Sequence, residues 1–208
     1  MQQVFKQELI RAAFEGMQMA ERSFSALTSN SVHFNCAPEY LMTVNIAEKL
    51  GKTAPNHLTW LEYKLRHARS DIRTGEGDPK PVLNRARCDI LMCWAYSKEP
   101  RAAFEIKRDV QSLSKIKRDV ERILYLMGEG CDGNTLQFGA VMFNTMAESL
   151  HGKKVIRDRV AQFHDQLADW RDGFDDKKHR LNIIAGEIKK RRAGDHWAPL
   201  ALVAERVR

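Results

Sequence analysis

The sequence has few of the patterns that identify membrane, secreted or zinc-binding proteins. No apolar run approaches the roughly 18–20 residues that span a bilayer, and charged residues interrupt the N-terminal region where a signal peptide would have its apolar block. The four cysteines show no C-x-x-C spacing, which argues against a zinc knuckle or a disulfide framework. No two of the seven histidines are four residues apart. We therefore expect a cytoplasmic protein with reduced thiols and no membrane partner.

The composition sets the size of the fold. A chain of 208 residues that is 43% hydrophobic and 29% charged can bury one sizeable core. We expect residues 1–30 to form an N-terminal amphipathic helix that packs or dimerises, and residues 31–150 to form the core. Residues 151–208 would add a C-terminal helix and a basic β-hairpin to the same domain.

Apolar periodicity predicts the individual elements. Helices are expected over 3–27, from Pro38 as first helical residue to Gly51, over 112–127, and around an apolar seam from Ile156 to Phe174. That seam favours packing on the sheet, with a homodimer contact as the alternative. Strands are expected over 58–65, 87–94, 102–107, 136–143, 181–184 and 199–204, with a connector over 66–80 and a basic turn over 189–194.

The two strands 87–94 and 102–107 carry the chemistry. A turn centred on Ser97 places Glu105 opposite Asp89, with Cβ atoms about 4.5–5.5 Å apart, and Lys107 lies on the same face. Two carboxylates this close repel unless a cation lies between them, and hard oxygen ligands suit Mg²⁺. Charges on buried strands are costly, and function is the usual reason to tolerate them. The alternative is a surface hairpin on which Asp89 and Lys107 merely pair.

This pattern resembles the PD-(D/E)xK nuclease superfamily, whose signature is Asp on one strand and Asp/Glu-x-Lys on the next. The match is Asp89 with Glu105-Ile106-Lys107, and Cys88 stands where the signature has proline. The resemblance covers roughly residues 38 to 145, because the family core is a helix, three strands, a helix and a fourth strand. It implies an α/β fold with a restriction-endonuclease-like core, built on a four- to six-stranded mixed sheet flanked by helices.

The resemblance also implies an activity. Asp89 and Glu105 would hold Mg²⁺, with Mn²⁺ as a substitute, and Lys107 would position the attacking water or offset transition-state charge. A glutamate of the first core helix, Glu39 rather than Glu48, would join the catalytic residues. We expect an endonuclease that hydrolyses DNA in restriction, defence or repair. The alternatives are an RNA or branched-DNA nuclease, and a non-catalytic nucleic-acid-binding or assembly protein that keeps the fold.

Two other triplets fit Glu-x-Lys: Glu62-Tyr63-Lys64 and Glu187-Ile188-Lys189. Neither has an aspartate on a preceding hairpin partner strand. We interpret both as ordinary strand residues.

The net charge of +7 favours a polyanionic partner. Residues 177–192 contain seven lysines and arginines against the single acid Glu187, and a second basic concentration spans 107–122. A basic hairpin resting on DNA is the sharper interpretation, and a solvated face that keeps the protein soluble is the other. The candidate nucleic-acid contacts are Gln111, Lys115, Arg118, Lys189, Lys190, Arg191 and Arg192.

Overall fold

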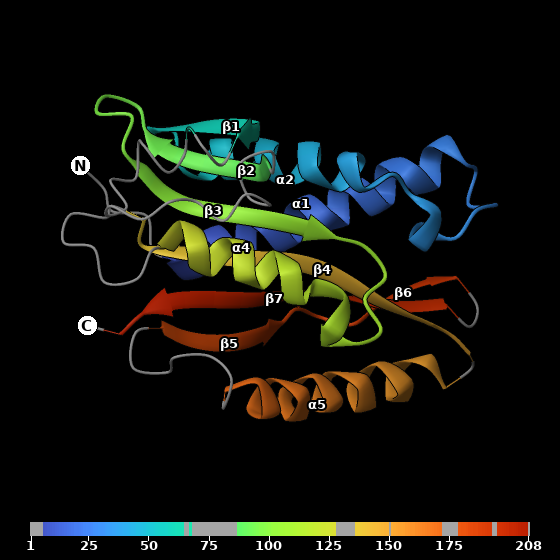
Figure 1. The fold of residues 1–208 in the computed structure, drawn as a ribbon. Coiled ribbons are helices and arrows are strands. Elements are labelled where there is room, and N and C mark those ends of the chain that lie inside the picture. Colours follow the sequence, from blue (N-terminus) through green and yellow to red (C-terminus); the bar gives the residue numbers. More distant parts are fainter. Residues whose placement is uncertain are drawn as a thin grey trace.

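One mixed sheet organises the protein. The computed structural model describes residues 6–64, 67, 87–127, 136–149, 151–171, 179–192 and 195–207. Seven strands of these residues form the sheet, in the order β1-β2-β3-β4-β7-β5 with β6 also paired to β7 (Figure 1). Only β3 and β4 are parallel. The strands are β1 (His57–Lys64), β2 (Arg87–Trp94), β3 (Pro100–Lys107), β4 (Phe138–Glu148), β5 (His179–Ala185), β6 (Lys189–Arg192) and β7 (Asp195–Arg206).

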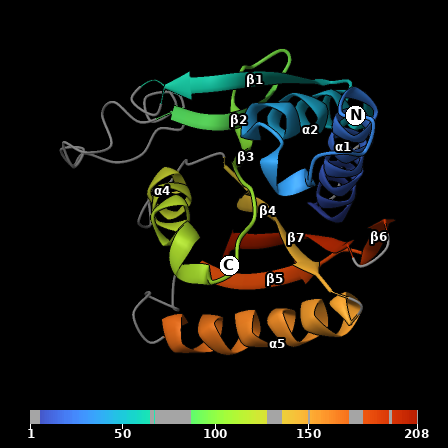
Figure 2. The ribbon, with the colours of Figure 1, turned by 90° about the vertical axis from the view of Figure 1, so that its right-hand side faces the viewer.

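Helices cover both faces of the sheet. On one face lie α1 (Lys6–Leu27) and α2 (Glu39–Thr53), and on the other α4 (Lys117–Met127) and α5 (Gly152–Arg171) (Figure 2). Side chains alternate along β3, so Phe104 packs in the core under α1 and α2 while Ala103 packs in the core under α4 and α5. Glu105 and Lys107 therefore belong to the α4 side.

Helix α1 is an integral layer of the domain. Its buried stripe includes Ala13 and Met17, which share one apolar cluster with Ile46 of α2. The two helices approach so closely at Gly16 that a Cβ there would lie 2.5 Å from the Cα of Ile46. Glycine at this position lets the helices meet backbone to backbone. Residues 6–27 therefore pack within the chain through α1.

Several boundaries differ from the sequence expectations. Seven strands replace the expected four to six, because 189–192 is strand β6 rather than a turn and pairs with the start of β7. A run of lysine and arginine has little intrinsic strand preference, so the pairing was not visible locally. The expected helix 112–127 begins with a 3₁₀ turn, Leu113–Ile116, and becomes α-helical only at Lys117. Pro38 is the N-cap of α2 rather than its first residue. The connector over 66–80 lies outside the described residues, except His67.

The order helix, three strands, helix, strand is present as α2, β1, β2, β3, α4 and β4. This is the order that the resemblance implies, inside a larger and mostly antiparallel sheet. None of the described helices is both long and apolar enough to cross a membrane.

Candidate active site on strands β2 and β3

Strand register brings the predicted pair together. The ladder between β2 and β3 ends at the pair of Ile90 with Phe104, and this register, continued by one residue, sets Asp89 opposite Glu105 as predicted. The backbone N–H of Ile106 donates to Asp89 Oδ2 at 2.7 Å. Burial raises the pKa of Asp89, and the Ile106 hydrogen bond and the Lys107 charge oppose that rise. The side chain is thus held at the sheet surface in a partly desolvated position.

Glu105 is the most deeply buried acid of the site, at 1% exposure. Arg122 of α4 binds it with a two-pronged contact: Nε donates to Oε1 at 3.1 Å and Nη2 to Oε2 at 3.0 Å. Burial raises the pKa of Glu105 to about 7, although the hydrogen bonds from Arg122 lower it. Desolvation therefore outweighs the ion pair at this carboxyl.

Lys107 links the sheet to α2. Its Nζ donates to Glu39 Oε1 at 3.0 Å and lies 3.9 Å from Asp119 Oδ1. Burial lowers the pKa of Lys107, but the surrounding carboxylates, Asp119 first, outweigh that effect and raise it. Lys107 is therefore a cation and a hydrogen-bond donor, not a general base.

Glu39, rather than Glu48, reaches this site. The first turn of α2 lies beside the end of β3, where Glu39 Oε2 also accepts from the backbone N–H of Arg108 at 3.3 Å. The Arg108 side chain donates to the Ala37 carbonyl at 2.8 Å and ties the helix start to the same loop. Glu48 is exposed near the other end of α2 and pairs with Lys52.

Two residues of the site were missed by sequence reasoning: Asp119 and Arg122, both on α4. Asp119 is 3% exposed, and it accepts a hydrogen bond from Arg122. Burial raises the pKa of Asp119, opposed by Lys107 and Arg122. The available signal was its position on the apolar stripe of the helix, three residues after Ile116 and four before Ile123.

Four carboxylates thus surround two cations. We call Glu39, Asp89, Glu105 and Asp119 the acidic cluster. Three of them raise the pKa of a neighbour in the cluster: Glu39 raises that of Asp89 and of Asp119, and Asp89 and Asp119 raise that of Glu105. Lys107 and Arg122 lie between them. With all six groups ionised, negative charge is in excess by two.

Glu62 adds to the edge of the cluster. We had set its Glu-x-Lys triplet aside, yet Glu62 falls between the β1–β2 pairs Leu61 with Ile90 and Tyr63 with Cys88, and so faces Asp89. Its charge contributes to the raised pKa of Asp89. Its backbone has φ of 51°, in the left-handed region.

Cys88 has no role as a nucleophile. Its side chain is fully buried, and Sγ donates to the Ile90 carbonyl at 3.1 Å and to the Phe104 carbonyl at 3.5 Å. Burial, with the nearby charges of Glu105 and Asp89, raises the thiol pKa well above its usual value. A neutral thiol fills the position where the family signature has proline.

The donor chemistry of the acidic cluster fits Mg²⁺, but its present arrangement does not yet form a ligand set. Carboxylate oxygens are the ligands that Mg²⁺ prefers. Among the residues that the structure describes, no three His, Cys, Asp or Glu side chains are arranged to hold a metal ion. Cations separate the carboxylates, and Arg122 occupies both oxygens of Glu105. Metal binding at Glu105 requires Arg122 to move.

The candidate contacts that follow β3 flank this site. Gln111 donates to Asp109, and Lys115 donates to the carbonyls of Arg108 and Asp109 at 3.2 and 2.7 Å, so Lys115 fastens the loop after Lys107. Arg118 is exposed on α4. An open groove of about 270 Å³ lies at the carboxyl ends of β3 and β4, where Gln111 lines it together with Arg159 and Glu148.

The basic hairpin divides into exposed and buried side chains. Lys190 is exposed, and Lys189 pairs with Glu187. Arg191 is 2% exposed in its side chain and pairs with Glu21 of α1 at 3.1 Å. This burial removes Arg191 from the surface that nucleic acid could contact. Arg192 belongs to β6, but its side chain lies outside the described part of the chain.

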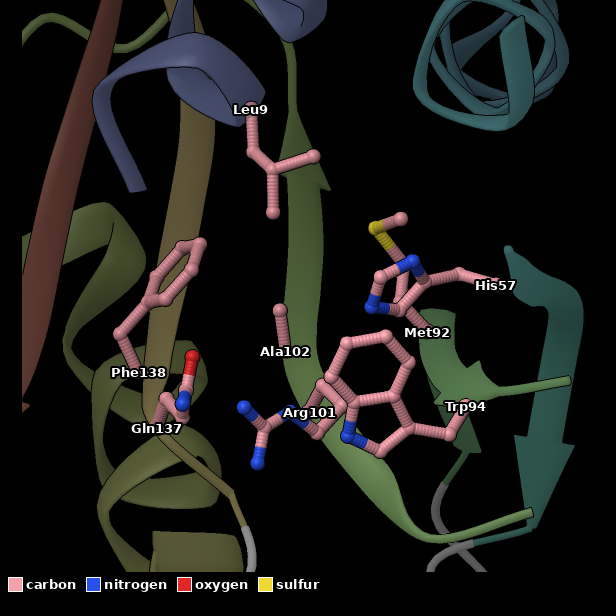
Figure 3. A pocket seen from close by; sticks show the side chains of 8 residues that line it. All are labelled: Leu9, His57, Met92, Trp94, Arg101, Ala102, Gln137 and Phe138. Atoms are coloured by element: carbon pink, nitrogen blue, oxygen red, sulfur yellow. The ribbon is translucent and has the colours of Figure 1, made fainter. Parts of the chain in front are cut away.

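A second hollow lies near the turn of the β2–β3 hairpin, at the end away from Lys107. Figure 3 shows Arg101 beside Trp94, with the His57 ring on the same indole. The guanidinium lies 4.9 Å from the Trp94 ring centroid, and the His57 centroid lies 4.2 Å from it. Burial, helped by Arg101, lowers the pKa of His57. The hollow has room for about one water molecule, so it is not a substrate site.

The chain has no match. Comparison with protein-family models, with curated proteins and with solved structures found none that resembles it. The function is therefore inferred from the residues of the site.

Proposed function

We propose that the protein is a metal-dependent nuclease that hydrolyses phosphodiester bonds, with DNA as the expected substrate and a restriction-endonuclease-like core. The observation that carries the proposal is the convergence of Asp89, Glu105 and Lys107 in the expected register, joined by Glu39 from the preceding helix. Buried carboxylates in excess over their cations are costly to fold. A function that uses their charge accounts for that cost.

Each side chain has a role that its surroundings support. Asp89 and Glu105 would offer oxygens to Mg²⁺, which when bound supplies Lewis acidity and a water of lowered pKa. Lys107 stays protonated and can donate to a phosphate oxygen or to a water molecule. Glu39 accepts a hydrogen bond from the Lys107 ammonium and so holds it in place. No covalent nucleophile is required.

The path of the nucleic acid follows from strand register. Lys107 pairs with Phe143, and exposed Lys190 pairs with His196, which itself pairs with Ala147. Through these pairs the two lysines are four residues apart along the strands and three strand spacings apart across the sheet. The distance between them is therefore roughly 20 Å. That is roughly six base pairs of duplex at about 3.4 Å each, so one DNA segment can reach both.

A plasmid assay tests the proposal. Purified protein is incubated with supercoiled plasmid and Mg²⁺, Mn²⁺ or EDTA, and nicked and linear products are measured. We expect cleavage with either metal, no cleavage with EDTA, and a loss of about 100-fold or more in Asp89→Asn and Lys107→Gln. Lys98 is exposed in the turn between β2 and β3, at the end of that hairpin away from Lys107. Lys98→Gln is therefore the matched control and should cleave like the wild type. Absence of metal-dependent cleavage by folded wild-type protein would refute the nuclease proposal.

A second candidate function is a nucleic-acid-binding or assembly protein that keeps this fold without cleavage. The Arg122–Glu105 contact favours it, because an arginine on both oxygens of a glutamate is also what a structural ion pair looks like. Folded protein that binds DNA, binds no Mn²⁺ and cleaves nothing would establish this alternative.

A further inference from the structure

Arg122 has two acceptors in the site. Its Nε and Nη2 cover both oxygens of Glu105, and Nη2 also donates to Asp119, three residues earlier on the same helix. The Arg122 side chain is 23% exposed, whereas that of Glu105 is 1% exposed. The arginine is therefore the more accessible partner, and it has a second anion within reach.

Arg122 lies on both oxygens that Glu105 could offer to a cation. Glu105 is buried, at 1% exposure, so few other groups can reach these oxygens. A divalent ion on either oxygen would lie within a few ångströms of the guanidinium, and the two positive charges would repel. Metal on Glu105 and Arg122 on Glu105 are thus competing states.

We propose that Arg122 is a built-in counter-cation that a divalent metal displaces from Glu105 onto Asp119. This inference rests on the proposed metal site. Moving to Asp119 keeps the guanidinium paired, so Glu105 can be released without leaving a buried charge uncompensated.

Mn²⁺ affinity in the absence of nucleic acid measures the competition. Titration calorimetry would compare the wild type with Arg122→Gln, Arg122→Lys, Glu105→Gln and Lys117→Gln. We expect Arg122→Gln to bind Mn²⁺ about tenfold more tightly than the wild type, within the range by which residues contacting metal ligands alter affinity. Arg122→Lys should tighten binding less, because one ammonium keeps the charge but cannot bridge both oxygens. Glu105→Gln should weaken it.

Lys117→Gln is the matched control. It removes one positive charge from an exposed position of the same helix, so it measures the general electrostatic effect of losing a cation. Binding should tighten clearly less than in Arg122→Gln. Because Arg122→Gln strands a buried carboxylate, circular dichroism must show that it folds; if it does not, Arg122→Lys carries the test.

The outcomes separate this inference from the proposed function. If Glu105→Gln loses Mn²⁺ binding while both Arg122 variants match the wild type, the metal site stands and the competition is refuted. If the Arg122 variants gain no more than Lys117→Gln, the competition is likewise refuted. If no folded variant binds Mn²⁺, the proposed metal-dependent function fails as well.

Discussion

Arg191 and Arg122 each bind a glutamate, and the surroundings of the two arginines differ. Arg191 of β6 meets Glu21 at 3.1 Å, and its other partners are neutral: Ser25 Oγ at 2.9 Å and the Val32 carbonyl at 2.5 Å. One cation faces one anion there, and the arginine side chain is almost fully buried, at 2% exposure. This contact joins the β6–β7 hairpin to α1 and to the loop that follows it.

Arg122 lies among more anions than cations. It contacts Glu105 and Asp119, with Asp89 and Glu39 next in the acidic cluster, and among the described residues Lys107 is the other cation of the cluster. It is the more exposed of the two arginines. A balanced pair suits a structural fastening, whereas an excess of anions around an accessible arginine suits a site that receives another cation. We therefore expect a structural role for Arg191 and, under the proposed function, a role in the site for Arg122.

The largest effect is expected from removing each arginine in turn. Arg191→Met should lower the free energy of unfolding by about 3–5 kcal/mol, because Glu21 loses its buried partner. Arg122→Met should cost a similar amount in EDTA. Chemical denaturation with and without Mg²⁺ separates them: the metal should recover part of the loss in Arg122→Met and none in Arg191→Met. Equal metal responses would remove the distinction between the two pairs.

A smaller effect is expected for the pH dependence of the free energy of unfolding. The pKa of Glu105 is raised to about 7 in the folded protein, above its ordinary value near 4.5. Between these values the folded state keeps a proton that the unfolded state has lost, so the stabilisation is complete at low pH and is lost as pH rises through 7. In EDTA, the wild type should therefore lose on the order of 2 kcal/mol relative to Glu105→Gln between pH 5 and pH 8.

Glu48→Gln provides the control for that measurement. Glu48 is exposed, and its pKa is lowered by the hydrogen bond from Lys52, so any pH dependence it contributes has the opposite sign. Urea unfolding at four pH values gives the slopes. Parallel curves for the wild type and Glu105→Gln would mean that Arg122 keeps the carboxyl ionised throughout.

The sequence was sufficient for the contacts that depend on local geometry. The turn centre at Ser97 and the two-residue period of strands predicted that Asp89 faces Glu105, and the observed register agrees. The order of helices and strands over α2 to β4 followed from periodicity in the same way. A hairpin closes over few residues, so its pairing is a local property.

The other contacts of the site depend on how elements that are distant in the sequence pack together. Asp119 and Arg122 enter the site because α4 packs across β4, β7 and β3, and that packing is set by the whole core. Side chains alternate between the two faces of the sheet along β6, so Lys190 lies on the opposite face from Lys189 and Arg191. Only the docking of α1 decides that Arg191 is the buried one. The resemblance already favoured Glu39 over Glu48, but only the docking of α2 shows that its first turn meets β3.

The smallest expected effect tests whether exposed and buried basic residues of β6 act differently on DNA. Each phosphate contact contributes nearly one unit to the slope of log affinity against log salt concentration. Lys190→Gln should therefore reduce that slope by about one, while Arg191→Lys, which keeps its charge in a buried position, should leave it unchanged. Lys98→Gln removes an exposed charge far from the proposed DNA path and should also leave the slope unchanged. Fluorescence anisotropy with labelled duplex at five salt concentrations measures all three slopes.

If Lys190→Gln and Lys98→Gln bind alike, β6 is a solvated face, and the DNA path must be sought along α4, where Arg118 is exposed.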